Sequence, residues 1–151
     1  MLSNNYARTL SSWKGVSGGS WIYRDDLSKS QTIWGTTTAL SIAWDGSKFC
    51  AVGDLGKVAT STDGVTWTNQ TGLSSTAWGT TTAYSIVWSG SKFCIVGNLG
   101  KVATSTDGVT WTYQTGLSST AWGTTLAYSI VWDGSKFCVV GASGKVATST
   151  D

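Results

Sequence analysis

Apolar and polar residues recur along most of the chain with a period of 44 residues. Two series of residues show this step most clearly: Trp34, Trp78 and Trp122, and Cys50, Cys94 and Cys138. Residues 78–121 differ from residues 34–77 at only a handful of positions, so the repeats are nearly identical. A fixed period in the low forties is typical of solenoids and propellers, in which one structural unit is repeated along the chain. The sequence therefore predicts a repeat architecture rather than an ordinary globular fold.

Within one period the pattern predicts four short strands and no helix. Residues 83–88 alternate in polarity, which places Tyr84, Ile86 and Trp88 on one face of a strand. Residues 92–96 are mostly apolar, which is typical of a strand buried on both faces. Two further strands are predicted at 101–105 and 109–113, with glycine-containing turns between the strands. Four strands in about 40–45 residues form one propeller blade, so we predict an all-β propeller with three four-stranded blades in the chain.

Residues 61–67 and 105–111, both Ser-Thr-Asp-Gly-Val-Thr-Trp, resemble the Asp-box (BNR) repeat of sialidase-like propellers. That repeat is usually written S-x-D-x-G-x-T-W, and one residue between Asp and Gly is missing here. The resemblance covers roughly residues 20–151 and implies a turn between the third and fourth strands, in which Asp binds backbone N–H groups and Trp packs into the blade. The structural residues it implies are Ser61, Asp63, Gly64, Trp67, Ser105, Asp107, Gly108, Trp111 and Asp151.

The repeat register also divides the chain. We predict blade segments at approximately 18–63, 64–107 and 108–151, and an N-terminal arm at 1–17 whose role the sequence does not define. The segment Gly18-Gly19-Ser20-Trp21-Ile22-Tyr23 aligns with an outer strand when Trp21 is matched to Trp67. The match is not perfect, because 12 residues separate Trp21 from Trp34 and 10 separate Trp67 from Trp78.

Three blades are too few to close a ring, since propellers use about 4–8. We therefore expect a homo-oligomer in which residues 18–23 of one chain complete the last blade of another. Two chains would give six blades, and this homodimer is the favoured arrangement. A trimer of nine blades and an open head-to-tail assembly are the alternatives, because contacts that do not close a ring propagate.

Composition narrows the choice of function. The net charge of +2 is too small to indicate nucleic-acid binding. No apolar run is long enough for a membrane helix, so no membrane insertion is expected, and the N-terminus lacks the pattern of a secretory signal. The three cysteines occupy equivalent strands, so we expect free, buried thiols. Free thiols suit synthesis in the cytoplasm, a reducing compartment, and they also suit a virion that is assembled there.

No catalytic, cofactor or metal site is predicted. The chain contains no His and no Glu. The sialidase resemblance would imply an arginine cluster and a tyrosine with a Glu partner, and the chain has only Arg8 and Arg24 as arginines. A pair of Asp residues could hydrolyse a glycoside, but the aspartates here are better explained as turn residues. They are also too isolated for calcium, which needs several converging oxygens.

Aromatic residues are the remaining binding candidates. In propellers, the connection between blades and the turn between the second and third strands share one face. An exposed Trp at the start of that connection, near Asp or Asn, would suit a sugar; alternatively, the Trp rings wedge between blades. The candidate ligand-binding residues are Trp34, Trp78, Trp122, Asp54, Asn98 and Tyr113. We expect a non-catalytic, multivalent, lectin-like propeller for a glycan or cell-surface polymer; the alternative is a structural assembly component or a scaffold without ligand.

Overall fold

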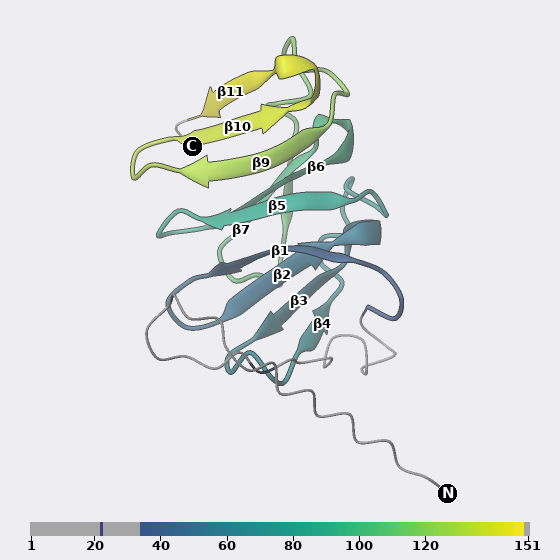
Figure 1. Ribbon diagram of the computed structural model, residues 1–151, viewed down its shortest axis with the longest axis vertical. Helices are drawn as coiled ribbons and strands as arrows, with labels where there is room; N and C mark the ends of the chain where they lie inside the picture. The colour runs from purple at the N-terminus through teal and green to yellow at the C-terminus, as the bar shows by residue number, and fades with distance from the viewer. Residues whose placement is uncertain (1–21, 23–33, 150–151) are drawn as a thin grey trace, which may run out of the picture.

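The computed structural model describes Ile22 and residues 34–149, which form three antiparallel sheets (Figure 1). The first sheet has the order β1-β2-β3-β4, with bounds Ala39–Trp44, Phe49–Gly53, Val58–Ser61 and Thr68–Gln70. The second has the order β5-β6-β7-β8, with bounds Ala83–Trp88, Phe93–Gly97, Val102–Ser105 and Thr112–Gln114. The third is β9-β10-β11, with bounds Ala127–Trp132, Phe137–Gly141 and Val146–Ser149. The predicted all-β repeat architecture is therefore confirmed for the described residues.

The strand predictions hold closely, with one informative exception. The alternating strand at 83–88 is present with those bounds, and the apolar strand at 92–96 is observed as Phe93–Gly97. The fourth strand is shorter than predicted, since Thr112–Gln114 alone joins the ladder of β7. The reason is local: the N–H groups of Val109 and Thr110 donate to the carboxylate of Asp107, so these residues belong to a turn.

The sheets group the strands differently from the predicted segments 18–63, 64–107 and 108–151. Strand β4 pairs with β3, so the boundary at 63/64 falls inside a sheet, and the boundary at 107/108 does the same in the second sheet. Each complete sheet therefore starts with its inner strand and ends with its outer strand. The predicted arm at 1–17, most of the segment 18–23 and Asp151 lie outside the described residues.

The sheets are stacked through their first strands. In Figure 1, β1, β5 and β9 lie side by side. The N–H of Ile86 donates to the hydroxyl of Ser41 at 3.2 Å, and the N–H of Ile130 donates to Ser85 at 3.3 Å. An edge strand presents unpaired N–H groups, and a serine of the preceding sheet satisfies one of them. The same polar contact therefore fixes each sheet to the next.

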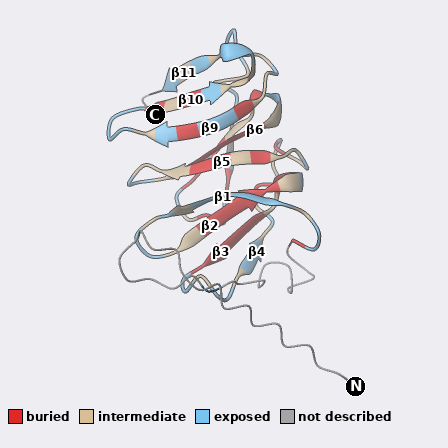
Figure 2. Cartoon of the chain, in the orientation of Figure 1, coloured by how far each residue is buried: buried red, intermediate tan, exposed pale blue. Residues whose placement is uncertain are grey.

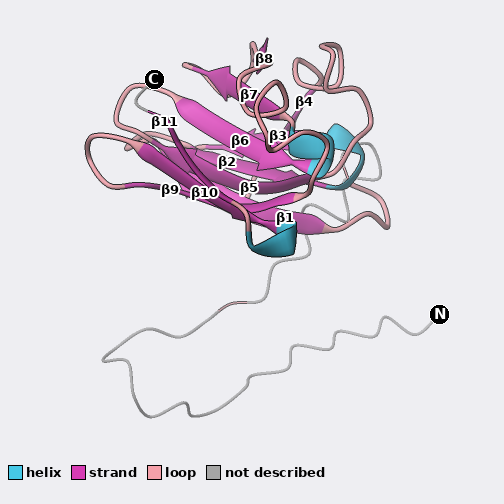
Figure 3. Cartoon of the chain, turned by 90° about the horizontal axis from the view of Figure 1, so that it is seen from above, coloured by secondary structure: helices cyan, strands magenta, loops and turns pink. Residues whose placement is uncertain are grey.

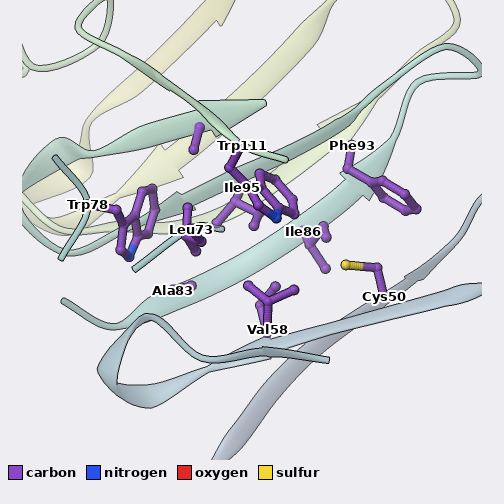
Figure 4. Packing of buried hydrophobic residues seen from close by; sticks show 11 residues of the cluster. Cys50, Val58, Leu73, Trp78, Ala83, Ile86, Phe93, Ile95 and Trp111 are labelled. Carbon is purple, nitrogen blue, oxygen red and sulfur yellow. The ribbon is translucent and has the colours of Figure 1, made fainter. Parts of the chain in front are cut away.

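The core lies between the sheets, and β6 contributes to it on both faces, as predicted. Phe93 and Ile95 pack with the first sheet (Figure 4). Cys94 and Val96 pack with the third sheet. All five residues of β6 are buried. Exposure is higher in the third sheet (Figure 2), whose far side no described sheet covers.

The cysteines are free, and two of the three are buried in this core. Burial raises the pKa of Cys50 and of Cys94 to about 12, because the low-dielectric interior disfavours the thiolate. Cys138, on the third sheet, is half-buried. The thiols of Cys50 and Cys94 therefore act as small apolar groups in the core.

Candidate binding face

The connections between sheets and the turns after the second strands meet at one end of the molecule (Figure 3). The turns are short 3-10 segments, η1 (Asp54–Gly56), η2 (Asn98–Gly100) and η3 (Ala142–Gly144). The first residue of each turn donates its N–H to a connection carbonyl: Asp54 to Thr38 at 3.1 Å, Asn98 to Thr82 at 3.0 Å and Ala142 to Leu126 at 3.0 Å. We call this end the turn face. The predicted sharing of one face by connection and turn is confirmed.

A lysine after each turn ties the connection down. The ammonium of Lys101 donates to the carbonyl oxygens of Ala77 at 2.9 Å and Trp78 at 2.7 Å. Lys57 donates to the carbonyl of Trp34 at 2.8 Å, and Lys145 repeats the contact in the third sheet. These lysines donate to carbonyl groups that no strand ladder uses, so their ammonium groups point toward the connections.

The tryptophans at the start of each connection are buried, so the expectation that they are exposed to a ligand is wrong. Trp34, Trp78 and Trp122 are 2%, 0% and 3% exposed. The Nε1 of Trp78 donates to the carbonyl of Thr81 at 2.8 Å, and that of Trp122 donates to Thr125 at 2.9 Å. A ring buried on both faces offers no surface on which a sugar can stack. The alternative interpretation, that the rings wedge between blades, describes Trp78 and Trp122, whereas Trp34 packs against Ala51, Ala59 and Trp67 of the first sheet.

Glycines explain how the rings reach the interior. A Cβ at Gly97 would lie 2.8 Å from Cζ2 of Trp78, and a Cβ at Gly56 would lie 3.1 Å from its Cδ1. Gly56 belongs to the first sheet's turn and Gly97 to β6, so the indole lies between the two sheets. Trp78 and Trp122 each have one glycine 22 residues before them and another 19 residues after them, and this fixed spacing is the signal in the sequence that could have found the packing.

The other predicted site residues are only partly brought together. The Asp54 carboxylate accepts the N–H of Thr38 and the hydroxyl of Thr82, both at 3.3 Å, and so joins the first sheet to the second. The Asn98 side chain accepts the N–H of Leu99 at 2.8 Å. Tyr113 lies in the middle of outer strand β8, where it pairs with Ala103 and packs against the core.

Sequence reasoning missed two exposed apolar residues on the turn face. Leu55 and Leu99 both have φ of 59°, the left-handed region that L-residues rarely adopt. Each precedes a glycine that also has positive φ, and the N–H of Lys101 bonds to the carbonyl of Asn98 at 3.2 Å. This is the geometry of a type I′ turn, which suits a hairpin but favours Asn or Gly at the leucine position.

We expect Leu99→Asn to raise the free energy of unfolding by about 1 kcal/mol, because asparagine tolerates the left-handed conformation better than leucine. Urea unfolding of the two proteins measures the change. Leu99→Ala is the control: it removes the exposed side chain but keeps a Cβ in the same conformation, so it should bring no comparable gain. Equal stabilisation by both substitutions would contradict the strain argument.

Comparison with solved structures identifies the architecture. The structure described as "YCF48 bound to D1 peptide" superposes with a TM-score of 0.65 at 19% sequence identity, over 77% of this chain. YCF48 is a β-propeller. This chain has a propeller fold. It spans 38% of the length of the YCF48 chain. No protein-family model matches the sequence, and no curated protein does.

At the opposite end of the propeller, the Ser-Thr-Asp-Gly turns are held by side chains. Oδ1 of Asp63 accepts the N–H groups of Val65 at 2.8 Å and Thr66 at 2.7 Å, together with the hydroxyl of Ser61 at 2.9 Å. The Ser61 hydroxyl in turn accepts the N–H of Gly64 at 2.9 Å. Asp107 and Ser105 make the same set of bonds in the second sheet. Trp111 is buried between the first two sheets, and Trp67 packs beside Trp34.

These bonds make the turns sensitive to acid. Hydrogen bonds from the backbone N–H groups of Thr66 and Val65 lower the pKa of Asp63 from 3.8 to about 2. Because the pKa is lower in the folded state than in the unfolded state, the carboxylate's contribution to stability is present above about pH 4 and is lost as the pH falls through 2.

We therefore expect the thermal midpoint to fall between pH 4 and about pH 2, and to fall less in the variant Asp63→Asn/Asp107→Asn. Thermal unfolding followed by circular dichroism across this range measures both. Thr62→Ala, an exposed neighbour in the same turn, should keep the pH dependence of the unmodified protein. A double variant with an unchanged pH dependence would show that other carboxylates carry the effect.

Within residues 34–149, no three His, Cys, Asp or Glu side chains converge as metal ligands would. In the same part of the chain, no helix is long and apolar enough to cross a membrane.

Proposed function

We propose that the protein is a non-catalytic binding propeller that uses the turn face. The observation that carries the proposal is the threefold recurrence of this face on a framework of similar sheets, with side chains that differ from one repeat to the next. The positions that vary on the face are Asp54, Asn98 and Ala142, Leu55, Leu99 and Ser143 in the turns, and Thr38, Thr82 and Leu126 in the connections. Repetition of a weak site raises avidity without any new contact, so three similar turns suit a repetitive ligand.

A glycan or cell-surface polymer remains the first candidate ligand. The exposed threonines Thr36, Thr80 and Thr124 lie in the connections, next to turns that carry Asp54 or Asn98. Hydroxyl, carboxylate and amide groups can fix the orientation of a polyhydroxylated ligand. The buried tryptophans take no part in this proposal, so the ligand would be held by polar groups and by the exposed leucines.

A peptide is the second candidate, and the exposed leucines favour it. Leu55 and Leu99 place apolar side chains on the turn face at an energetic cost to the backbone. The structure of YCF48 was described with a bound D1 peptide, which gives a precedent within the fold. A scaffold or assembly role without any ligand is the remaining alternative.

The absence of catalysis is part of the proposal. The chain has neither His nor Glu, and the pKa values of about 12 at Cys50 and Cys94 disfavour nucleophilic thiolates. We further propose that residues 61–67 and 105–111 are shortened Asp boxes. The bonds from Val65, Thr66 and Ser61 to the Asp63 carboxylate, repeated around Asp107, support that interpretation.

Parallel glycan and peptide arrays test the proposal. We expect a signal for the unmodified protein that Asp54→Ala/Asn98→Ala removes. These substitutions suit the fold, since Ala142 occupies the equivalent position in the third sheet. Thr106→Ala, exposed in a turn at the opposite end, is the control and should retain the signal. Absence of any signal on both arrays would favour the scaffold alternative.

A further inference from the structure

Among the described residues, the turn face contains two junctions at which a turn of one sheet meets the connection into the next sheet. At the first junction η1 lies against β5, and at the second junction η2 lies against β9. A Cβ at Gly56 of η1 would overlap the carbonyl oxygen of Gly79, and a Cβ at Gly100 of η2 would overlap that of Gly123. The backbone of the two junctions is therefore built alike, so the differences between them come from side chains.

A carboxylate closes the first junction. Oδ1 of Asp54 accepts the hydroxyl of Thr82, and Oδ2 accepts the N–H of Thr38, both at 3.3 Å. Both oxygens are therefore used inside the protein. A ligand that covered Asp54 would also have to remove water from a charged group, which costs far more than covering a neutral one. The first junction is thus satisfied by the protein itself.

The second junction lacks this closure. Asn98 replaces Asp54 there, and Leu126 replaces Thr82, so the position that donated a hydroxyl is now apolar. Oδ1 of Asn98 accepts the N–H of Leu99, its neighbour in the chain, at 2.8 Å. Within residues 34–149, no group accepts a hydrogen bond from Nδ2 of Asn98. The second junction therefore presents free N–H donors on a neutral side chain.

Apolar side chains accompany these donors. Leu99 is 42% exposed and has φ of 59°, a conformation in which leucine strains the backbone. Leu126 is half-buried in the connection. The strand that lies against η2 adds an aromatic pair, since the ring of Tyr128 lies 5.7 Å from the ring of Tyr84. At the first junction the corresponding pair is Leu40 and Tyr84, so two tyrosines meet only at the second of these two junctions.

We propose that the second junction is a subsite for an uncharged peptide segment. The amide of Asn98 donates to a carbonyl of the peptide, and an apolar side chain of the peptide packs on Leu99. This inference rests on the proposed function and takes up its second candidate ligand. A peptide carries carbonyl acceptors between its side chains, which matches an amide donor that lies among leucines. A glycan presents hydroxyl groups, and the second junction has neither the carboxylate nor the threonine hydroxyl of the first.

The exchange of Asp for Asn decides which junction can accept a peptide carbonyl. An ionised carboxylate has no hydrogen to donate, so Asp54 would repel the carbonyl oxygen, whereas the amide of Asn98 can bind it. Covering Asn98 also replaces its hydrogen bonds to water with one to the ligand, and no charge is buried. The second junction is therefore the one that a peptide can cover without leaving a polar group unpaired.

Exchanging the side chains of the two junctions tests the proposal on the full chain. Asn98→Asp/Leu126→Thr gives the second junction the side chains of the first, and Asp54→Asn/Thr82→Leu does the reverse. Each combination already occurs in this chain, so both variants should fold, which circular dichroism checks. The probe is an array of short uncharged peptides that each contain one leucine, isoleucine or phenylalanine, read beside a glycan array.

The two exchanges should have opposite effects. We expect Asn98→Asp/Leu126→Thr to weaken peptide binding at least about tenfold, because the donor and one apolar contact are lost. Asp54→Asn/Thr82→Leu should strengthen binding on the array, because a second subsite raises avidity.

Single substitutions separate the leucines. Leu99→Ala should weaken peptide binding more than Leu55→Ala, the equivalent change at the first junction. Thr106→Ala, exposed at the opposite end, is the control and should bind as the unmodified protein does.

Three results would overturn the inference and leave the proposed function in place. They are peptide binding that survives Asn98→Asp/Leu126→Thr but not Asp54→Ala/Asn98→Ala, peptide binding that both exchanges weaken equally, and binding to glycans without binding to peptides. A lack of signal from the unmodified protein on both arrays would overturn the inference and the proposed function together.

Discussion

Trp78→Ala is expected to lower the free energy of unfolding by about 3–5 kcal/mol, a large part of the roughly 5–15 kcal/mol that holds a domain of this size together. The indole is 0% exposed and lies between the first two sheets. Its removal leaves a cavity whose walls include backbone at Gly56 and Gly97, which cannot collapse without moving both sheets. The carbonyl of Thr81 also loses the Nε1 donor.

Urea unfolding measures this loss. Trp44→Ala is a matched control, because the same side chain is 44% exposed on β1. We expect less than half the loss for Trp44→Ala. Equal losses would show that burial between the sheets does not determine the contribution of these tryptophans.

Gly72→Ala is expected to cost about 3 kcal/mol, the upper end of the range for forcing a methyl group into a packed core. The new Cβ would overlap the carbonyl oxygen of Val109, and backbone cannot rotate away as a side chain can. The segment that carries Trp111, just before β8, would therefore have to shift from its place between the sheets.

Gly116→Ala is the control for this substitution, since the same change is made at the equivalent position, where a Cβ meets nothing within 4 Å. Compared by urea unfolding, Gly116→Ala should differ from the unmodified protein by less than about 0.5 kcal/mol. A large loss at both positions would mean that glycine is needed there for its backbone conformation rather than for space.

The strand order and the burial of β6 could be predicted from the sequence because both depend on short-range alternation of residues. Because the repeats are nearly identical, equivalent residues could also be assigned from the sequence, and the contacts of Asp63 and Asp107 are the same. The period of the repeat does not show, however, whether an indole at the start of a connection points into the core or toward solvent. Trp78 turns inward because Gly56 and Gly97 leave room for it, and that depends on two elements remote in sequence.

The shortened fourth strand has a different cause. Val109 and Thr110 alternate as a strand would, and their β-branched side chains favour extended structure. The carboxylate of Asp107 nevertheless captures both N–H groups, so a side chain competes with the ladder for the backbone. A pattern of apolar and polar residues carries no information about this competition. The positive φ of Leu99 escaped prediction for a similar reason, since leucine is not a residue that indicates such a turn.

The serine-to-isoleucine bond between neighbouring sheets also bears on how the chain folds. It links residues 45 positions apart, about one repeat, and the strand pairs inside each sheet are closer still in sequence. Ordering therefore requires only short loops to close, and a structured sheet can serve as the template on which its neighbour forms. Structure can therefore spread from any one of the described sheets to the next along the chain.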